Sequence, residues 1–406
     1  MEFLETAWKG FRNLKPRRQQ WRPGLNVILG PNGSGKTNLL ESFNVLSGWG
    51  AFTATAAAAA GGKTSSLIAW EAKEAKEAKI RALLMGRAAG ERDVEVQAQI
   101  GARMSLRAGN ERVTHSELRS LVPSLSFLPQ DIGLLDGSPS VRRLFLDKLC
   151  ALSSPLYARR LAEYKQLVRH RTALLRQDRK WRDAASALRA TVPPIAQLGG
   201  WIRNSRRKVV DLLARAFSGV SGDLEISGEN EPCSPSAALL PFRVEVALEL
   251  RGGSGREDEK GEKDARDAVM ALAAALETGL ERERHAGSVL VGPHRDDLLF
   301  SCLGRPAAHS LSRGQKRRVV MATILAAGRL VEARLRLKPI LLLDDVAAEL
   351  DAEGKELMAQ ALADTGWQIF VTGVEDPFGD APETRQKSQK LPKTLWRVQE
   401  GDLRMV

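Results

Sequence analysis

The sequence of 406 residues predicts an α/β protein in which an α-helical lobe is inserted into a sheet-containing domain. Three observations predict this fold class. A short apolar run at 25–29 leads through a glycine-rich loop into a helical pattern that begins at Thr37. A second apolar run at 340–343 lies far along the chain. Between the two runs, residues 155–217 have helical periodicity that is interrupted at Pro193-Pro194.

Composition excludes several classes of protein. With 43% apolar and 27% charged residues, the chain is neither disordered nor fibrous. It contains no run of eighteen apolar residues and no secretory signal, so we expect a cytoplasmic protein without membrane contact. Cys150, Cys233 and Cys302 are too far apart for a zinc site or a disulfide framework. The net charge of +12 favours a polyanionic partner, whereas a surplus scattered over the surface would support only solubility.

Alternation at 94–100, followed by a turn at 108–111, predicts a small antiparallel unit. For 71–79, EAKEAKEAK favours a helix while its flanks read as strands, which leaves that segment undecided. Loops are predicted at 50–64, 252–267 and 376–394, helices at 268–284 and 313–334, and strands around 288–303.

The glycine-rich loop matches the phosphate-binding pattern G-x-x-x-x-G-K-[ST] in full. Glycines let the backbone N–H groups surround phosphate oxygens, and the N-terminus of the next helix adds positive potential. Lys36 is expected to reach the β- and γ-phosphates, and Thr37 to hold Mg²⁺. The predicted ATP-binding residues of the loop are Gly30, Pro31, Asn32, Gly33, Ser34, Gly35, Lys36, Thr37 and Asn38.

The second apolar run supplies the carboxylates that a nucleoside triphosphatase needs. Asp344 follows the run and is expected at the C-terminal edge of a strand, where open α/β sheets bind ligands. We predict that Asp344 is a second Mg²⁺ ligand and that Asp345 polarises the attacking water. An aspartate that only caps a helix is the alternative, which the paired phosphate-binding loop disfavours.

A third motif, LSRGQ at 311–315, precedes a helix and resembles the LSGGQ signature of ABC-type ATPases. In that superfamily the signature of one protomer completes the nucleotide site of the other, which implies that Ser312, Gly314 and Gln315 contact ATP across a homodimer. Ala348-Glu349-Leu350-Asp351 resembles the D-loop of the same superfamily. The alternative interpretation of Ser312 is a helix N-cap.

The helical segment 155–217 carries most of the net charge, because it holds fifteen basic and four acidic residues. Basic side chains on a helical lobe favour contact with DNA phosphates, which positions a protein without reading sequence. A solvated basic face is the alternative. The candidate DNA-binding residues are Arg159, Arg160, Lys165, Arg169, Arg171, Arg206, Arg207 and Lys208.

Four segments are similar to hallmark segments of the RecF family of bacterial recombination mediators, namely 25–42, 127–147, 291–300 and 339–351. The long separation of the phosphate-binding loop from the signature also points to this DNA-repair branch. The resemblance implies an ABC-type ATPase head with a P-loop mixed sheet, an antiparallel β subdomain and an inserted basic α-helical arm lobe. The expected domains are 1–150, the inserted lobe at 151–285, and 286–406 with the signature and the second aspartate motif.

The resemblance also implies roles for residues that the motifs leave open. By position, Gln130 is expected to contact the metal and the γ-phosphate, and Arg12 to contact nucleotide, although a solvated arginine is an equal alternative. The segment from His294 to Asp297 is a family marker for which structural ion pairing is the first expectation. Lys36, Gln130 and Asp345 are the predicted catalytic residues.

The function implied is ATP-dependent binding of duplex or gapped DNA in replication, recombinational repair and the SOS response to DNA damage. An ATP-sandwiched homodimer would assist recombinase loading with RecR-like mediator proteins. Whether ATP is hydrolysed is left open; if so, the short side chain of Asp345 predicts slow, DNA-stimulated turnover. Alternatives are an SMC/Rad50-like repair ATPase and a nucleic-acid scaffold with a vestigial nucleotide site. A helical hairpin of about 40 Å, at 1.5 Å per residue, excludes a long coiled coil.

Overall fold

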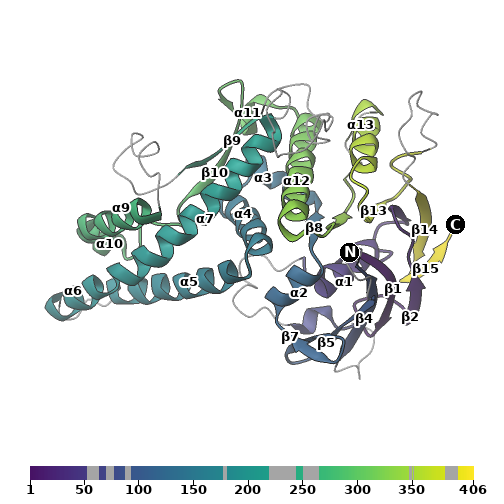
Figure 1. Ribbon diagram of the computed structural model, residues 1–406, viewed down its shortest axis with the longest axis horizontal. Coiled ribbons are helices and arrows are strands. Elements are labelled where there is room, and N and C mark those ends of the chain that lie inside the picture. The colour runs from purple at the N-terminus through teal and green to yellow at the C-terminus, as the bar shows by residue number, and fades with distance from the viewer. Residues whose placement is uncertain are drawn as a thin grey trace. The chain divides into compact units, whose positions relative to one another are not determined.

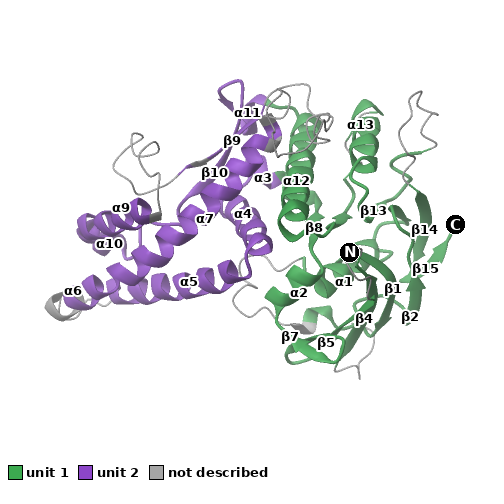
Figure 2. Ribbon diagram, viewed as in Figure 1, with its two compact units in different colours: residues 1–132, 219–241, 311–406 green, residues 133–218, 242–310 purple. Residues whose placement is uncertain are grey.

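The computed structural model describes residues 1–52, 64–69, 77–86, 93–176, 181–218, 244–249, 265–346, 350, 352–379 and 392–406 (Figure 1). These residues belong to two compact units (Figure 2). Unit 1 contains the described parts of Met1–Ile132 and Leu311–Val406, and unit 2 those of Gly133–Ser218 and Phe242–Ser310. Unit 2 is therefore wider than the lobe predicted at 151–285, because the preceding helix and the following strands pack within it.

A six-stranded sheet with the order β15-β14-β3-β13-β12-β8 forms the centre of unit 1. Neighbouring strands from β14 to β8 are parallel, and β15 is an antiparallel edge strand, so the sheet is mixed as predicted. Its strands are β3 (Leu25–Leu29), β8 (Ser124–Phe127), β12 (Ile340–Leu343), β13 (Ile369–Gly373), β14 (Lys393–Gln399) and β15 (Asp402–Met405). Because Leu343 pairs with both Val371 and Phe127, the carboxyl ends of β8, β12 and β13 meet at one edge.

An antiparallel sheet with the order β2-β1-β4-β5-β6-β7 is the second layer of unit 1. Its strands are β1 (Glu2–Lys9), β2 (Arg17–Gln20), β4 (Ala78–Met85), β5 (Asp93–Ile100), β6 (Met104–Ala108) and β7 (Glu111–Val113). Burial alternates along β4, where Ala78, Ile80, Ala82 and Leu84 are buried and the residues between them face outward. The antiparallel unit was therefore predicted correctly, and it is larger than expected.

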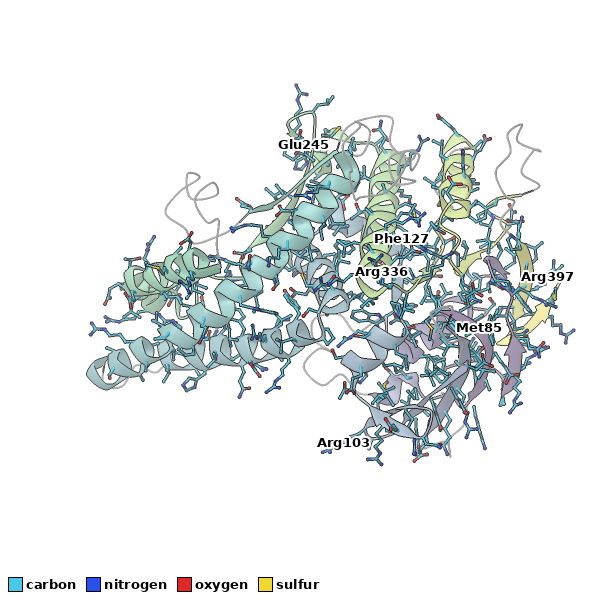
Figure 3. All side chains as sticks on the ribbon, in the orientation of Figure 1. Met85, Arg103, Phe127, Glu245, Arg336 and Arg397 are labelled. Carbon is cyan, nitrogen blue, oxygen red and sulfur yellow. The ribbon has the colours of Figure 1, made fainter. Side chains whose placement is uncertain are left out.

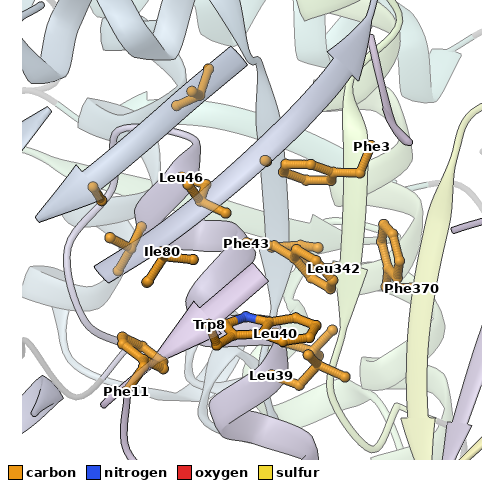
Figure 4. Packing of buried hydrophobic residues seen from close by; sticks show 14 of the residues in the cluster. Phe3, Trp8, Phe11, Leu39, Leu40, Phe43, Leu46, Ile80, Leu342 and Phe370 are labelled. Atoms are coloured by element: carbon orange, nitrogen blue, oxygen red, sulfur yellow. The ribbon is translucent and has the colours of Figure 1, made fainter. Parts of the chain in front are cut away.

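Helix α1 (Lys36–Leu46) lies between the two sheets and joins their cores. Aromatic rings from all three layers meet there: the Phe43 centroid lies 4.4 Å from that of Phe370 and 5.0 Å from that of Phe3 (Figure 4). The phosphate-binding loop leads directly into α1. Apolar burial on both sides of α1 thus holds this loop in a fixed place. The other helical elements of unit 1 are η2 (Thr64–Leu67), α2 (His115–Leu121), η3 (Pro129–Ile132), α12 (Arg313–Leu335) and α13 (Ala352–Ala363).

Unit 2 is mainly helical and contains a small antiparallel sheet with the order β11-β10-β9. Pro193 and Pro194 lie in the first turn of α7, where a missing N–H costs nothing, so they begin a helix. The elements are α3 (Gly133–Asp136), α4 (Pro139–Ser153), α5 (Pro155–Leu175), α6 (Trp181–Ala190), α7 (Val192–Ser218), β9 (Val244–Glu249), α9 (Ala265–Thr278), α10 (Leu280–Ala286), β10 (Asp297–Cys302), β11 (Arg305–Pro306) and α11 (Ala307–Ser310).

Several predicted segments fall outside the described residues. These are most of the loops at 50–64, 252–267 and 376–394, residues 71–76 of the undecided segment, and 348, 349 and 351 of the D-loop. Within the described ranges, no helix combines the length and the apolar character that crossing a membrane requires.

Candidate nucleotide-binding site

The loop between β3 and α1 has a backbone that demands glycine. Gly33 and Gly35 have φ angles of 80° and 111°, in the left-handed region that side chains disfavour. A Cβ atom on Gly35 would also lie 2.8 Å from the Asn13 side-chain oxygen. Asn13 in turn accepts a hydrogen bond from the Asn38 amide at 2.8 Å, so it braces both the loop and the start of α1. Sequence reasoning assigned no role to Asn13.

The Lys36 ammonium lies inside the loop. Its Nζ donates to the carbonyl oxygens of Gly30 and Pro31 at 2.6 and 2.9 Å. Burial lowers the Lys36 pKa below its usual value, and the charges of Asp344 and Asp345 oppose that shift. The cation and both carboxylates of the predicted site therefore lie within electrostatic reach of one another.

Two threonines hold the two oxygens of the Asp344 carboxylate. Thr37 Oγ1 donates to Oδ2 at 2.8 Å, and Thr372 Oγ1 donates to Oδ1 at 2.5 Å. Thr37 is the second residue of α1, Asp344 follows β12 and Thr372 lies in β13, so the fold brings together residues from three distant segments. Sequence reasoning assigned no role to Thr372, and its contact with Asp344 was missed.

The donor set fits Mg²⁺, because a hydroxyl and a carboxylate oxygen 2.8 Å apart are the hard ligands that this ion prefers. A second observation fits a phosphate. Ser34 Oγ is buried in the loop and has no hydrogen-bond partner among the described residues. A buried hydroxyl without a partner is costly, and a phosphate oxygen would satisfy it.

Asp345 adopts a conformation that is rare for a residue with a side chain. Its φ angle is 49° and its side chain is exposed. The Asp345 N–H donates to Thr372 Oγ1 at 3.1 Å, and Arg317 donates to the carbonyl of Val346 at 3.2 Å. These contacts hold the backbone that follows β12, where Asp344 is buried and Asp345 is exposed.

The signature residues form the N-terminus of α12. Ser312 is the N-cap: its Oγ accepts from the Gln315 N–H at 3.3 Å, while Gln315 Oε1 accepts from the Ser312 N–H at 2.9 Å. Within one chain, Ser312 therefore acts as the helix N-cap that the sequence offered as the alternative to nucleotide contact. Ser312 is exposed, and its hydroxyl retains a hydrogen to donate and a second lone pair.

Arg12 and Gln130 occupy different surroundings. The Arg12 guanidinium is bound in a fork by Glu41, with contacts of 2.7 and 3.1 Å, and only 10% of its side chain is exposed. Arg12 thus ties its own loop to α1. Gln130 is exposed in η3, after the strand that neighbours β12. Nucleotide contact by either residue stays a prediction.

Two of the eight candidate DNA-binding residues are buried and are removed from that set. Arg171 is fully buried, and its Nη2 lies 2.8 Å from Glu283. Arg206 is 1% exposed, and its Nη2 lies 2.7 Å from Asp147. The prediction was wrong for both because charged residues were taken as exposed, whereas these arginines pair with acids inside unit 2.

The other six candidates reach the surface of unit 2 to different extents. Lys165, Arg169 and Lys208 are exposed. Arg159 is exposed and forms an i,i+4 pair with Glu163 at 3.0 Å. Arg160 stacks over the Trp201 ring at 4.3 Å, and Arg207 is half-buried. Contact between these residues and DNA remains a prediction.

The segment from His294 to Asp297 belongs to a polar network in unit 2, in which Asp296 and Asp297 are buried, His294 is half-buried and Arg295 is exposed. Arg203 pairs with Asp296 at 2.8 Å and Arg142 with Asp297 at 2.7 Å, which agrees with the expected structural ion pairing. Both ring nitrogens of His294 are engaged, one with the Tyr164 hydroxyl at 2.7 Å and one with the Val289 carbonyl at 3.1 Å. Burial lowers the His294 pKa to about 4, so the ring is neutral near pH 7.

The chain is similar to known proteins over most of its length. The sequence profile of the RecF/RecN/SMC N-terminal domain family matches residues 4–387. A DNA replication and repair protein RecF from Moorella thermoacetica is 32% identical over 365 residues, covering 90% of this chain and 88% of the relative. This chain belongs to the RecF family. The RecF protein of Clavibacter sepedonicus is also 32% identical, over 385 residues, covering 92% and 89% of the two chains.

Solved structures support the same fold. The structure of the recombination mediator protein RecF-ATP in the RecFOR pathway has a TM-score of 0.77 at 23% identity, covering 100% of this chain and 97% of the other. An Smc head bound to the C-winged helix domain of ScpA has a TM-score of 0.53 at 15% identity, with coverages of 100% and 96%. The predicted ABC-type ATPase head is thus confirmed for this RecF-family chain.

Proposed function

We propose that this RecF-family protein binds DNA in an ATP-dependent manner during replication and recombinational repair. The observation that carries the proposal is the contact of Thr37 with Asp344 beside the phosphate-binding loop. A vestigial nucleotide site would have no need of this pairing. Family membership supports the biological process, since curated relatives are named DNA replication and repair proteins.

ATP is proposed to bind along residues 30–38, with its phosphates against the backbone N–H groups of that loop, which every one of these residues except Pro31 carries. Lys36 would exchange its two carbonyl partners for phosphate oxygens, and Ser34 would gain a partner for its hydroxyl. Thr37 and Asp344 would hold Mg²⁺, which neutralises charge on the phosphates. Asp345 would orient the attacking water, and Gln130 would contact the metal from the adjacent strand end.

One copy of the chain is proposed to build half of a working site. Ser312, Gly314 and Gln315 at the N-terminus of α12 offer an exposed hydroxyl and backbone N–H groups, which suit the γ-phosphate held by a second copy. ATP bound between two copies would therefore couple dimerisation to nucleotide. Slow hydrolysis, stimulated by DNA, would release the dimer.

The exposed basic residues of the helical lobe are proposed to contact duplex or gapped DNA. Lys165, Arg169 and Lys208 are the first candidates because their charges face solvent. Phosphate contacts of this kind bind without reading sequence, so junction preference would come from the geometry of the dimer. RecR-like mediators are the proposed protein partners, and recombinase loading is the proposed outcome.

The test is sedimentation of the full chain with and without ATP, Mg²⁺ and duplex DNA. Asp345→Asn should retain ATP binding and accumulate a DNA-bound dimer, because water activation is lost while the phosphate-binding loop stays intact. Lys36→Ala should remain monomeric in ATP. A chain that stays monomeric under every condition, Asp345→Asn included, would contradict the proposal.

A further inference from the structure

The antiparallel sheet of unit 1 has an outward face on which charges are segregated by position. Directly opposed residues on neighbouring antiparallel strands point to the same side of a sheet. One such row crosses all six strands through Arg18, Ala7, Arg81, Gln97, Arg107 and Arg112. The next row contains Lys9, Lys79, Gln99 and Ser105. We call Lys9, Arg18, Lys79, Arg81, Arg107 and Arg112 the basic face.

All six side chains of the basic face are exposed, and the two rows contain no carboxylate. Three acidic residues of this outward side, Glu5, Glu95 and Asp93, lie in the rows toward the opposite ends of β1, β4 and β5. A fourth, Glu77, directly precedes β4, and its Oε2 accepts a hydrogen bond from Gln99 Nε2 at 2.8 Å. Within the described residues, the one ion pair of the basic face joins Arg18 and Glu5 at 3.5 Å, and the exposed arginine gains little from it.

Stability alone does not account for this arrangement. Lys9 stands directly opposite Lys79, and Arg107 stands directly opposite Arg112. Like charges at directly opposed positions destabilise a sheet, while a mixture of signs would have solvated the same surface without that cost. A polyanion that neutralises both pairs on binding would remove the cost.

The dimensions of the basic face suit the backbone of duplex DNA. Neighbouring β-strands lie about 4.8 Å apart, so the row from β2 to β7 spans roughly 24 Å. Along the axis of duplex DNA, one strand carries a phosphate about every 3.4 Å, so this length corresponds to about seven phosphates of that strand. Gln97 and Ser105 lie between the cations and can donate hydrogen bonds to phosphate oxygens. Arg103, in the turn between β5 and β6, extends from the rim of the sheet (Figure 3).

We infer that the basic face is a second duplex-DNA surface, on the ATPase head rather than on the helical lobe. The inference rests on the proposed DNA-binding function but needs neither ATP nor dimerisation, because the sheet is complete within one unit. Single-stranded DNA is disfavoured, since no outward residue of the described strands in these rows is aromatic and able to stack on bases.

The experiment measures how the affinity of the full chain for a 30-base-pair duplex depends on salt, without ATP. Lys79→Gln, Arg81→Gln and Arg112→Gln are combined in one variant. The matched control combines Arg266→Gln, Arg334→Gln and Arg404→Gln, which removes equal charge from exposed positions on other elements. Losing three phosphate contacts should lower the slope of log affinity against log salt by about 2.7, while the control slope should stay close to that of the unsubstituted chain.

Equal slopes for the two triple variants would overturn the inference, as would a protein without ATP-independent binding. A thermal melting temperature lower for the basic-face variant than for its control would also overturn it, because the side chains would then serve the fold. A third variant, with Lys165→Gln, Arg169→Gln and Lys208→Gln, separates the two proposals. Loss of ATP-dependent binding in this variant supports the helical-lobe surface, whatever the basic face does.

Discussion

Replacing Arg206 by methionine tests the burial that removed this residue from the DNA-binding set. Arg206 donates to Asp147 Oδ1 at 2.7 and 3.1 Å, to the Tyr157 hydroxyl at 3.1 Å and to the Pro293 carbonyl at 2.6 Å. Methionine fills much of the same volume, but it removes both of the Arg206 donors from Asp147 Oδ1 and leaves only the Tyr157 hydroxyl, which donates at 2.6 Å. Breaking a buried ion pair in this way costs about 3–5 kcal/mol.

The assay is urea denaturation of the full chain followed by circular dichroism, with DNA affinity measured in parallel. At a denaturant dependence of about 2 kcal/mol per molar, the transition of the helical unit should move down by roughly 2 M. Lys208→Met is the matched control, because Lys208 is exposed on the same helix and its replacement should change stability by no more than about 0.5 kcal/mol.

Adding Asp147→Leu to Arg206→Met provides a second check. Removing both charges leaves no unpaired carboxylate, so most of the lost stability should return. The reasoning is refuted if Arg206→Met leaves the urea midpoint unchanged and lowers the salt slope of DNA binding by about 0.9, since that is the behaviour of an exposed phosphate contact.

Three further side chains, Thr372 and Arg12 in unit 1 and His294 in unit 2, make contacts whose loss should be measurable. Thr372→Val should lower ATP turnover about tenfold while ATP affinity changes little, because the Asp344 carboxylate and the Asp345 N–H both lose the Thr372 hydroxyl as a hydrogen-bond partner. Thr372→Ser keeps the hydroxyl and should retain turnover. Because the folded-state pKa of His294 is about 4 against 6.5 when unfolded, stability is fully present above pH 6.5 and falls by about 3 kcal/mol toward pH 4. His294→Gln, which keeps a donor and an acceptor, should flatten that pH dependence in urea titrations. Arg12→Ala should weaken the packing of α1 and lower the melting temperature, because Glu41 would remain buried without its partner.

Contrary results have specific meanings. Equal activities for Thr372→Val and Thr372→Ser would show that the hydroxyl does not position the carboxylates. An unchanged pH dependence in His294→Gln would assign the acid lability to other groups. An Arg12→Ala variant that loses ATP affinity without loss of stability would support the predicted contact of Arg12 with nucleotide.

The conformation of the phosphate-binding loop could be predicted from the sequence, because it depends on residues that are neighbours in the chain. The positive φ angles of Gly33 and Gly35 and the position of Lys36 at the start of α1 follow from a motif in which each residue type has one backbone or charge requirement. The apolar run before Asp344 likewise indicated a buried strand, because four apolar residues that begin directly after Lys338-Pro339 have the length of a strand and are too few for a buried helix.

Helical periodicity contained a signal for the buried arginines that charge counting missed. Arg171 lies seven residues after the buried Tyr164, and Arg206 lies four residues before the buried Val210, so each occupies the inward side of its helix. The sequence could place these arginines inward, but their partners Glu283 and Asp147 lie in other elements whose packing no local pattern predicts.

What the sequence by itself determined is therefore the set of residues whose role depends on near neighbours: the loop glycines, the cation that begins α1 and the strand that ends at Asp344. The tertiary structure alone decided that Thr372 would join Asp344 to Asp345, that two arginines would be internal, and that six cations from five strands would share one face. The physical reason is that hydrogen bonds, ion pairs and sheet register depend on which distant segments meet, and chain order does not specify that meeting.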